Sequence, residues 1–225
     1  IPLAFFQFFI LEYPNNPIIW NIPVKLIILT CLFWYALSVI ILLLLNSLRW
    51  TVIVSSVLTL LLSLVFYYVE LFRGEPLQFL DIYGISTAME VAGGYKLTFG
   101  VGPSVVIILT LMVIGVALAG DRRKVFCSGI SRVVIRIAAC IMAVLLFLGM
   151  AEVDWQTSLG VTVKAFNVKW TYNNYGTVIG FTGLAKANSS EPPEGYSEEA
   201  AREVADSVSI GNNEDNGLIT PENII

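Results

Sequence analysis

Long apolar runs separated by short polar stretches dominate the first two-thirds of this chain. Four runs stand out: Leu26–Leu45, Thr51–Val69, Val105–Ala119 and Val133–Ala151. A helix needs about 20 apolar residues to cross the hydrocarbon core of a bilayer, and it satisfies its own backbone hydrogen bonds there. The pattern therefore predicts four complete membrane spans, the third opened by Pro103 at the first helical position.

A shorter apolar run, Ile1–Leu11, precedes these spans and ends at a turn sequence, Tyr13–Pro17. It is too short to cross a bilayer, and it lacks both an initiating Met and the basic residues that begin a signal peptide. We interpret it as the end of a helix whose beginning is absent. The predicted fold class is an all-α membrane protein: a five-helix transmembrane bundle with a truncated first helix, over residues 1–151.

The stretch Glu70–Gly102 differs because it mixes charged with apolar residues. From residue 82 its periodicity is that of an amphipathic helix, ended by Gly93 and Gly94. Its two faces carry, respectively, Ile82, Ile85, Met89 and Ala92, and Ser86, Thr87 and Glu90. Such a helix either lies in the membrane surface or packs on the bundle, and both alternatives place it at the interface.

Basic residues predict the orientation of the bundle. The loop between the last two predicted spans holds Arg122, Arg123, Lys124 and Arg132, and Arg49 lies in the other loop on the same side. Short basic loops stay in the cytoplasm, so both loops are predicted to be inside. The stretch 70–102 and the whole tail after Ala151 are then outside.

The tail is acidic and polar, unlike the bundle. Residues 1–151 carry nine Lys or Arg and six Asp or Glu, a net charge of +3, whereas residues 152–225 carry four and eleven, a net charge of −7. We interpret 152–218 as a mixed juxtamembrane linker with short helices, one near Tyr172–Leu184 and one after Ser197, and 219–225 as the start of a buried strand. An acidic tail argues against a nucleic-acid partner.

Composition restricts the chemistry further. The chain is 56% hydrophobic and 13% charged, and it contains no histidine, which removes the commonest metal ligand and general base. Glu152 and Asp154 lie close together just outside the last predicted span. Paired carboxylates can hold a cation, but two acids at a membrane edge are more often solvated. No phosphate-binding glycine loop or nucleophile elbow is present. The predicted span interiors hold no acidic or basic residue, which argues against a transporter.

Three groups of motifs follow one another along the chain. The stretch from Glu70 to Phe99 contains Arg73-Gly74-Glu75-Pro76, then Asp81 and a glycine-ended helix. The tail contains Asn174-Tyr175-Gly176, Gly180-Phe181 and Pro193–Ser197, and the chain closes with Pro221–Ile225. In this order the motifs resemble the outer loop, the connection into the catalytic domain and the first catalytic strand of the lipoteichoic acid synthase-like phosphoglycerol transferases, which belong to the sulfatase/alkaline phosphatase superfamily.

The resemblance implies an enzyme of the bacterial plasma membrane, multi-pass, with its tail extracytoplasmic. Such an enzyme moves glycerol phosphate from phosphatidylglycerol to a lipoteichoic-acid-type acceptor, with a metal-bound Thr nucleophile and a manganese-like ion. Those groups belong to the family's catalytic domain, which follows the matched strand, so we expect no catalytic residue and no cofactor in this chain. Its partners would be membrane lipids, above all phosphatidylglycerol, and its own catalytic domain.

Charged and aromatic residues outside the spans are candidates for contact with a lipid headgroup. They are Arg73, Glu75, Asp81, Lys96, Trp170 and Tyr172. The alternative for the first four is a simple hydrated turn. Two other functions stay open: a transferase of the same superfamily that moves phosphoethanolamine or acts on glucans, and a membrane anchor or sensor without catalytic activity.

Overall fold

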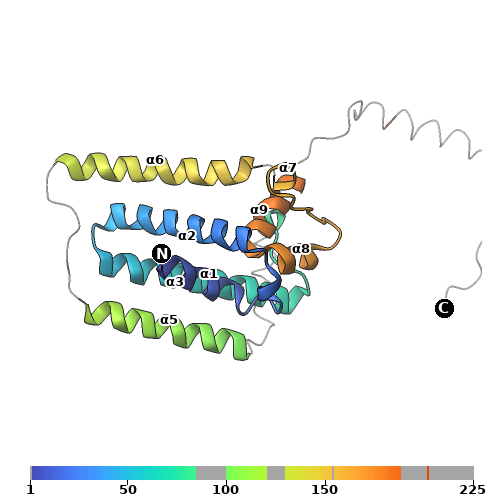
Figure 1. Ribbon diagram of the computed structural model, residues 1–225, viewed down its shortest axis with the longest axis horizontal. Coiled ribbons are helices and arrows are strands. Elements are labelled where there is room, and N and C mark those ends of the chain that lie inside the picture. Colours follow the sequence, from blue (N-terminus) through green and yellow to red (C-terminus); the bar gives the residue numbers. More distant parts are fainter. Residues whose placement is uncertain (1, 85–99, 121–129, 154, 189–201, 203–225) are drawn as a thin grey trace, which may run out of the picture. The chain divides into compact units, whose positions relative to one another are not determined.

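The structure is a computed structural model that describes residues 2–84, 100–120, 130–153, 155–188 and 202. Every regular element in these ranges is a helix, as the predicted fold class requires. The chain divides into two compact units, residues 1–189 and 190–225. All the elements named below belong to the first unit (Figure 1).

Three helices in the described ranges are long and apolar enough to cross a membrane. They are α2 (Val24–Leu45), α3 (Leu48–Arg73) and α5 (Val101–Ala119). At 1.5 Å per residue, the 22 residues of α2 extend about 33 Å, close to the hydrocarbon thickness of a bilayer. The chain is therefore a membrane protein.

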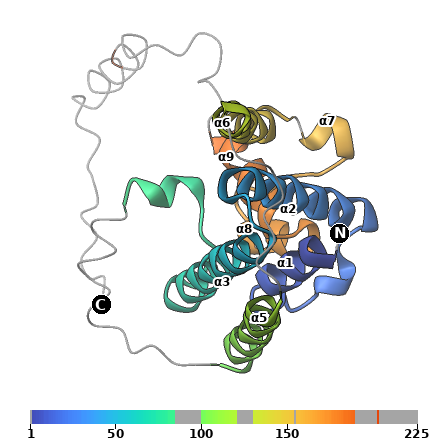
Figure 2. The same ribbon diagram turned by 90° about the vertical axis from the view of Figure 1, so that its left-hand side faces the viewer.

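Two further apolar helices run beside the spans. The first is α1 (Pro2–Glu12), which packs on both α2 and α3. The second is α6 (Ile130–Glu152), which packs on α2, while α5 packs on α3. Figure 2 looks along the helices and shows this order, with α6 beyond α2 and α5 beyond α3. Short helices α7 (Trp155–Leu159), α8 (Val168–Tyr175) and α9 (Thr177–Asn188) gather at one end of the bundle (Figure 1).

Small hydroxyl residues form the buried face of α3. Thr51, Ser55, Thr59 and Ser63 recur every four residues, and Ser56 lies beside them; none is more than 2% exposed. Their size lets neighbouring helices approach closely, which is how helices associate where lipid removes the hydrophobic driving force. Thr59 Oγ1 donates to the Ser55 carbonyl at 2.9 Å, so its polar atom is satisfied within its own helix.

The spans begin and end at residues suited to sharp turns. Asn46 ends α2 in the left-handed region (φ 53°), which asparagine tolerates better than most residues, and α3 starts only two positions later. Gly74 ends α3 with φ 83° and donates its N–H to the Glu70 carbonyl at 2.8 Å. Pro103 is the third residue of α5 rather than the first, still within the turn where its missing N–H costs nothing.

Three spans are found among the described residues, whereas the sequence predicts four complete spans, a truncated first helix and an outer amphipathic helix. The apolar part of α6 found among the described residues, Val133–Leu146, is shorter than a span, and α1 has 11 residues. Residues 85–99, with Lys96 and most of the expected amphipathic helix, lie outside the described residues. So do the basic loop 121–129, the helix expected after Ser197 and the strand expected at 219–225.

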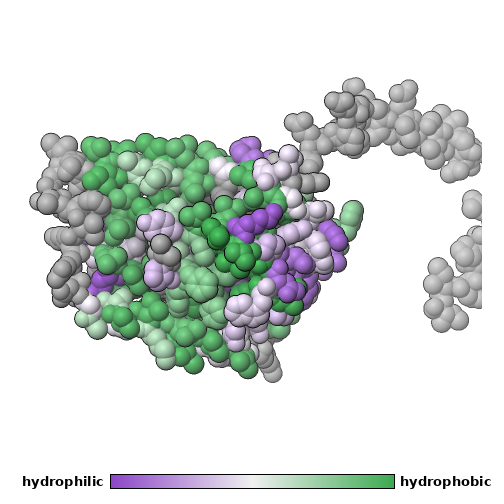
Figure 3. All heavy atoms as spheres, in the orientation of Figure 1, coloured by the Kyte–Doolittle hydropathy of each residue, from purple (hydrophilic) through white to green (hydrophobic). Residues whose placement is uncertain are grey.

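The surface separates into an apolar belt and a polar end. Large hydrophobic side chains are exposed along the spans, among them Leu61 and Leu111. Figure 3 shows hydrophobic residues over the sides of the helices and hydrophilic residues gathered near α7, α8 and α9. Apolar exposure on this scale is expected of a surface that meets lipid rather than water.

We predict that Ser56→Leu destabilises the bundle, because this fully buried position leaves no room for a larger side chain. Overpacking of this kind costs roughly 1–3 kcal/mol. The matched control is Val57→Leu, at the next position but 37% exposed toward lipid. Thermal unfolding in detergent should show a lower Tm for the first variant only, and equal Tm values would contradict the close packing of this face.

Candidate functional site

The polar end is where α1 and α3 finish, where α2 and α5 begin, and where η1 (Ile19–Asn21), η2 (Phe79–Ile82) and α7 to α9 lie. Its centre is the turn that follows α1. Asn15 Nδ2 donates to the Leu11 carbonyl at 2.6 Å and to the Ser63 carbonyl at 3.2 Å. Ser63 Oγ in turn donates to the Ile10 carbonyl at 2.7 Å. These bonds fix the end of α1 against α3.

Asn16 ties the same turn to the juxtamembrane helices. Its Nδ2 donates to the Asn173 carbonyl in α8 at 3.0 Å, and its Oδ1 accepts from the Ile18 N–H at 3.0 Å. The side chain is 3% exposed. Because a buried amide group is costly unless its hydrogen bonds are made, this contact holds α8 in one place on the bundle.

Glu12, the last residue of α1, caps α9 from across the chain. Its Oε1 accepts a 2.6 Å hydrogen bond from the backbone N–H of Thr177, the first residue of α9. A carboxylate at a helix N-terminus is favoured by the unpaired N–H groups and the helix dipole. Gly176 permits the approach: its φ is 87°, and a Cβ there would lie 3.2 Å from Glu12 Oε1.

Burial decides the protonation of Glu12. The side chain is 0% exposed, and desolvation raises the pKa of this carboxyl to about 7, against the lowering effect of the hydrogen bonds from Thr177 and Asn16. Its Oε2 has no hydrogen-bond partner among the described residues. Glu12 thus changes charge near neutral pH, in a chain that has no histidine.

Tyr172 joins α8 to the segment after α3. Its hydroxyl donates to the Leu77 carbonyl at 2.5 Å, and its ring lies 6.2 Å from that of Phe66. Gly180 of α9 faces the ring so closely that a Cβ there would lie 2.8 Å from Tyr172 Cδ2. Burial raises the pKa of Tyr172, and the negative charges of Asp81 and Glu12 add to the effect. This tyrosine is therefore a neutral hydrogen-bond donor.

Two ion pairs lie at the edge of the polar end. Lys169 Nζ is 2.6 Å from Glu70 Oε1, and Arg73 pairs with Asp81. Asp81 Oδ2 also accepts from the Gln78 N–H at 2.7 Å, which closes the first turn of η2. Pairs this exposed contribute at most about 1 kcal/mol each, so their value lies in positioning charge rather than in stability.

A pocket of about 270 Å³ opens beside the Glu70–Lys169 pair. Its walls come from the turn after α1, the last turns of α3 and the start of α8. They comprise Pro14, Asn15, Pro17, Tyr67, Glu70, Leu71 and Lys169. The combination of an ion pair, an amide and apolar surface at the end of a span suits an amphipathic molecule rather than a wholly apolar one.

No known protein family, curated protein or solved structure matches this chain. In the ranges that the structure describes, no three Cys, Asp or Glu side chains come together to form a metal site.

The structure brings some of the predicted headgroup residues together. Arg73 and Asp81 pair at the end of α3, and Glu75 is exposed two residues beyond Arg73. Trp170 lies on α8, where Lys164 Nζ is 3.8 Å from its ring centroid. Tyr172 is 4% exposed, inside the protein, and Lys96 is outside the described residues.

Sequence reasoning did not single out Glu12, Asn15, Asn16, Glu70 or Lys169. The two asparagines were recognised only as part of a turn sequence. Glu12 offered one signal, because it is an acidic residue directly after an apolar run. The structure places Gly176 between α8 and α9, and it places Gly180 inside α9 against Tyr172.

We predict that the stability of this protein falls as the pH rises from about 4.5 to about 7. In the unfolded chain Glu12 ionises near its ordinary pKa of 4.5, whereas in the fold its pKa is about 7. The unfolded state therefore binds fewer protons in this window, and the loss, on the order of 3 kcal/mol, is complete above pH 7. Glu12→Gln keeps an acceptor for Thr177 and should remove this part of the slope.

The measurement is Tm in detergent at intervals from pH 5 to pH 8. Glu75→Gln removes an exposed carboxylate from the same end and is the matched control. It should keep the slope of the unaltered protein. If Glu12→Gln also kept that slope, the assignment to Glu12 would be wrong.

Proposed function

We propose that this chain is the membrane-anchoring domain of a cell-envelope phosphoglycerol transferase of the lipoteichoic acid synthase-like family. The complete enzyme would move glycerol phosphate from phosphatidylglycerol to a lipoteichoic-acid-type acceptor at the bacterial plasma membrane. Three spans that carry no Asp, Glu, Lys or Arg in their interiors support an anchor over a transporter. The order of the motifs at 70–99, 174–181 and 221–225 supports the choice of family.

The observation that carries this proposal is the buried attachment of α8 and α9 to the polar end. Glu12, Asn16 and Tyr172 each bond a backbone group across the junction, and all three are nearly or fully buried. Whatever follows α9 in the chain therefore starts from a fixed point at the end of the spans. A catalytic domain that acts on a diacyl lipid needs such a fixed height above the bilayer.

In this proposal α1 and α6 complete a five-span bundle, and the polar end faces the cell exterior. The donor lipid would approach through the pocket beside Lys169, with its phosphate near that ammonium group and near Arg73. Glu75, Asp81, Lys96, Trp170 and Tyr172 are the remaining proposed contributors, Tyr172 by positioning α8 through its bond to Leu77. The metal and the Thr nucleophile would be supplied by the catalytic domain, as the resemblance implies.

We predict that the reading frame beyond Ile225 encodes an early Glu and a later Thr in the metal-site context of the sulfatase superfamily. Sequencing of the gene provides the measurement. A frame that stopped near this point would favour the membrane anchor or sensor without catalytic activity. A frame with the active-site pattern of phosphoethanolamine or glucan-directed enzymes would favour that branch of the superfamily instead.

We further predict that Arg73→Ala, Glu75→Ala and Asp81→Ala lower the turnover of phosphatidylglycerol by the complete protein in vesicles. Loss of one charge-assisted hydrogen bond should reduce kcat/KM roughly tenfold, mainly through KM. Glu152→Ala is the control, because this exposed acid ends α6 at the same end of the bundle and is not among the proposed headgroup residues. Unchanged turnover in all three variants would count against lipid approach through this surface.

A further inference from the structure

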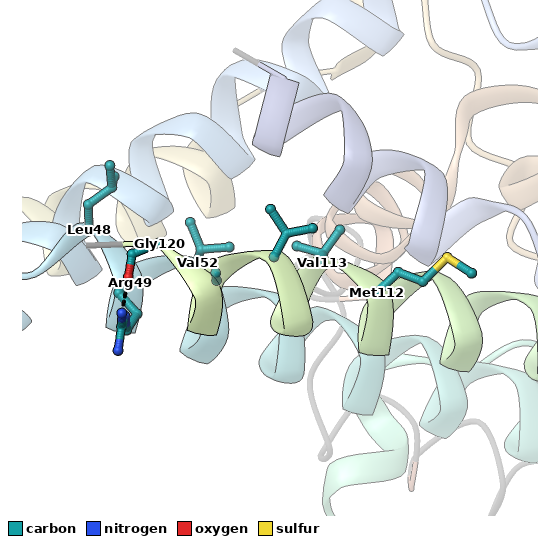
Figure 4. Close-up of a pocket in the computed structure, with 8 residues that line it drawn as sticks. Leu48, Arg49, Val52, Met112, Val113 and Gly120 are labelled. Atoms are coloured by element: carbon teal, nitrogen blue, oxygen red, sulfur yellow. Dashed lines mark hydrogen bonds between the residues drawn. The ribbon is translucent and has the colours of Figure 1, made fainter. Parts of the chain in front are cut away.

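A second groove lies at the other end of the bundle, between α3 and α5. We call this end, where α2 and α5 finish and α3 and α6 begin, the arginine end, after Arg49 and Arg136. The groove there has a volume of about 390 Å³, and its walls are Leu48, Arg49 and Val52 of α3 and residues of α5 from Met112 to Gly120. Figure 4 shows Arg49 beside Gly120 at one end of the row, with Val52, Val113 and Met112 following along the helices.

The walls of this groove are apolar and face outward. Met112 is 62% exposed and Val116 is 75% exposed. Both helices are long and apolar enough to cross the membrane, so the groove opens into hydrocarbon rather than water. A flexible acyl chain is the molecule that hydrocarbon can supply to fill it.

Arg49 gives the groove a cationic end. One terminal nitrogen of its guanidinium donates to the Gly120 carbonyl, and its buried Nε has no hydrogen-bond partner among the described residues. Both ion pairs found in the described ranges are at the polar end. So are all the described carboxylates: Glu12, Glu70, Glu75, Asp81 and Glu152.

The surroundings of Arg49 add to the positive charge. Arg136, near the start of α6, donates through Nε to the Leu44 carbonyl at the same end. The four residues that follow Gly120 in the sequence carry three basic groups and one acidic group. A cation with no described carboxylate beside it, at the boundary of hydrocarbon, attracts an anion from the membrane surface.

We propose that this groove binds one anionic glycerophospholipid, with an acyl chain between α3 and α5 and the phosphate at Arg49. A second copy of this chain is a poorer occupant. Copies of a membrane protein insert with the same orientation, so a partner seated here would bring its own arginine end beside Arg49. Like charges would then meet where lipid phosphate could instead neutralise them.

The test uses the full chain, purified and reconstituted with equal amounts of phosphatidylglycerol and phosphatidylcholine that carry identical acyl chains. Native mass spectrometry measures which lipid stays bound. We expect phosphatidylglycerol to be retained preferentially and Arg49→Gln to reduce that preference about fivefold, the effect of one cation near the surface. Lys25→Gln is the control, because it removes one exposed cation at the polar end, outside the groove and away from Arg49.

A second variant and a second readout address the acyl chain. Val113→Trp should fill the groove and lower the retention of both lipids, whereas Leu61→Trp, on the lipid-exposed side of α3 outside the groove, should not. A photoreactive acyl chain on phosphatidylglycerol should label the peptide that contains residues 112–117. Equal retention of the two lipids, no effect of Arg49→Gln, labelling spread evenly over the spans, or chain-to-chain cross-links at Met112 would each overturn the proposal.

Discussion

Helix ends leave backbone N–H and C=O groups without partners, and at the polar end several helices end beneath others, out of reach of water. Buried side chains supply the missing hydrogen-bond partners. Asn15 donates to a carbonyl in the last turn of α1, and Asn16 donates to a carbonyl in the last turn of α8. Glu12 accepts a hydrogen bond from the first N–H of α9. Each such bond is costly to leave unmade, so together they determine where the juxtamembrane helices lie.

The two ends of the bundle differ in charge as well as in shape. The polar end combines acids and bases in short-range pairs, whereas the described residues of the arginine end include bases alone. At the polar end the ion pairs join segments of the protein and border a pocket with polar and apolar walls. At the arginine end the positive charge can interact with anionic lipid. The two ends of the bundle therefore present different charges to the two surfaces of a membrane.

Much of the fold follows from the sequence because hydrophobic length is a strong signal. The helices α2 and α5 lie close to the predicted runs, and the αL ends at Asn46 and Gly74 follow rules that hold in any helix. The candidate site is harder to predict from the sequence, because its hydrogen bonds join residues far apart in the chain. Glu12 and Thr177, for example, are 165 positions apart. No local pattern predicts such a pair. Tyr172 was a candidate for contact with a lipid headgroup because of its juxtamembrane position, whereas the structure buries it inside the protein.

The close approach of Glu12 to Gly176 restricts which substitutions these two positions can carry together. A Cβ at position 176 would lie 3.2 Å from Glu12 Oε1, so the carboxylate would have to shift to admit it, and substitutions at the two sites must be compatible with each other. We therefore expect α1 and the juxtamembrane helices α8 and α9 to vary together in sequence, although nearly the whole membrane domain separates them in the gene. Chimaeras between homologues should exchange both segments or neither.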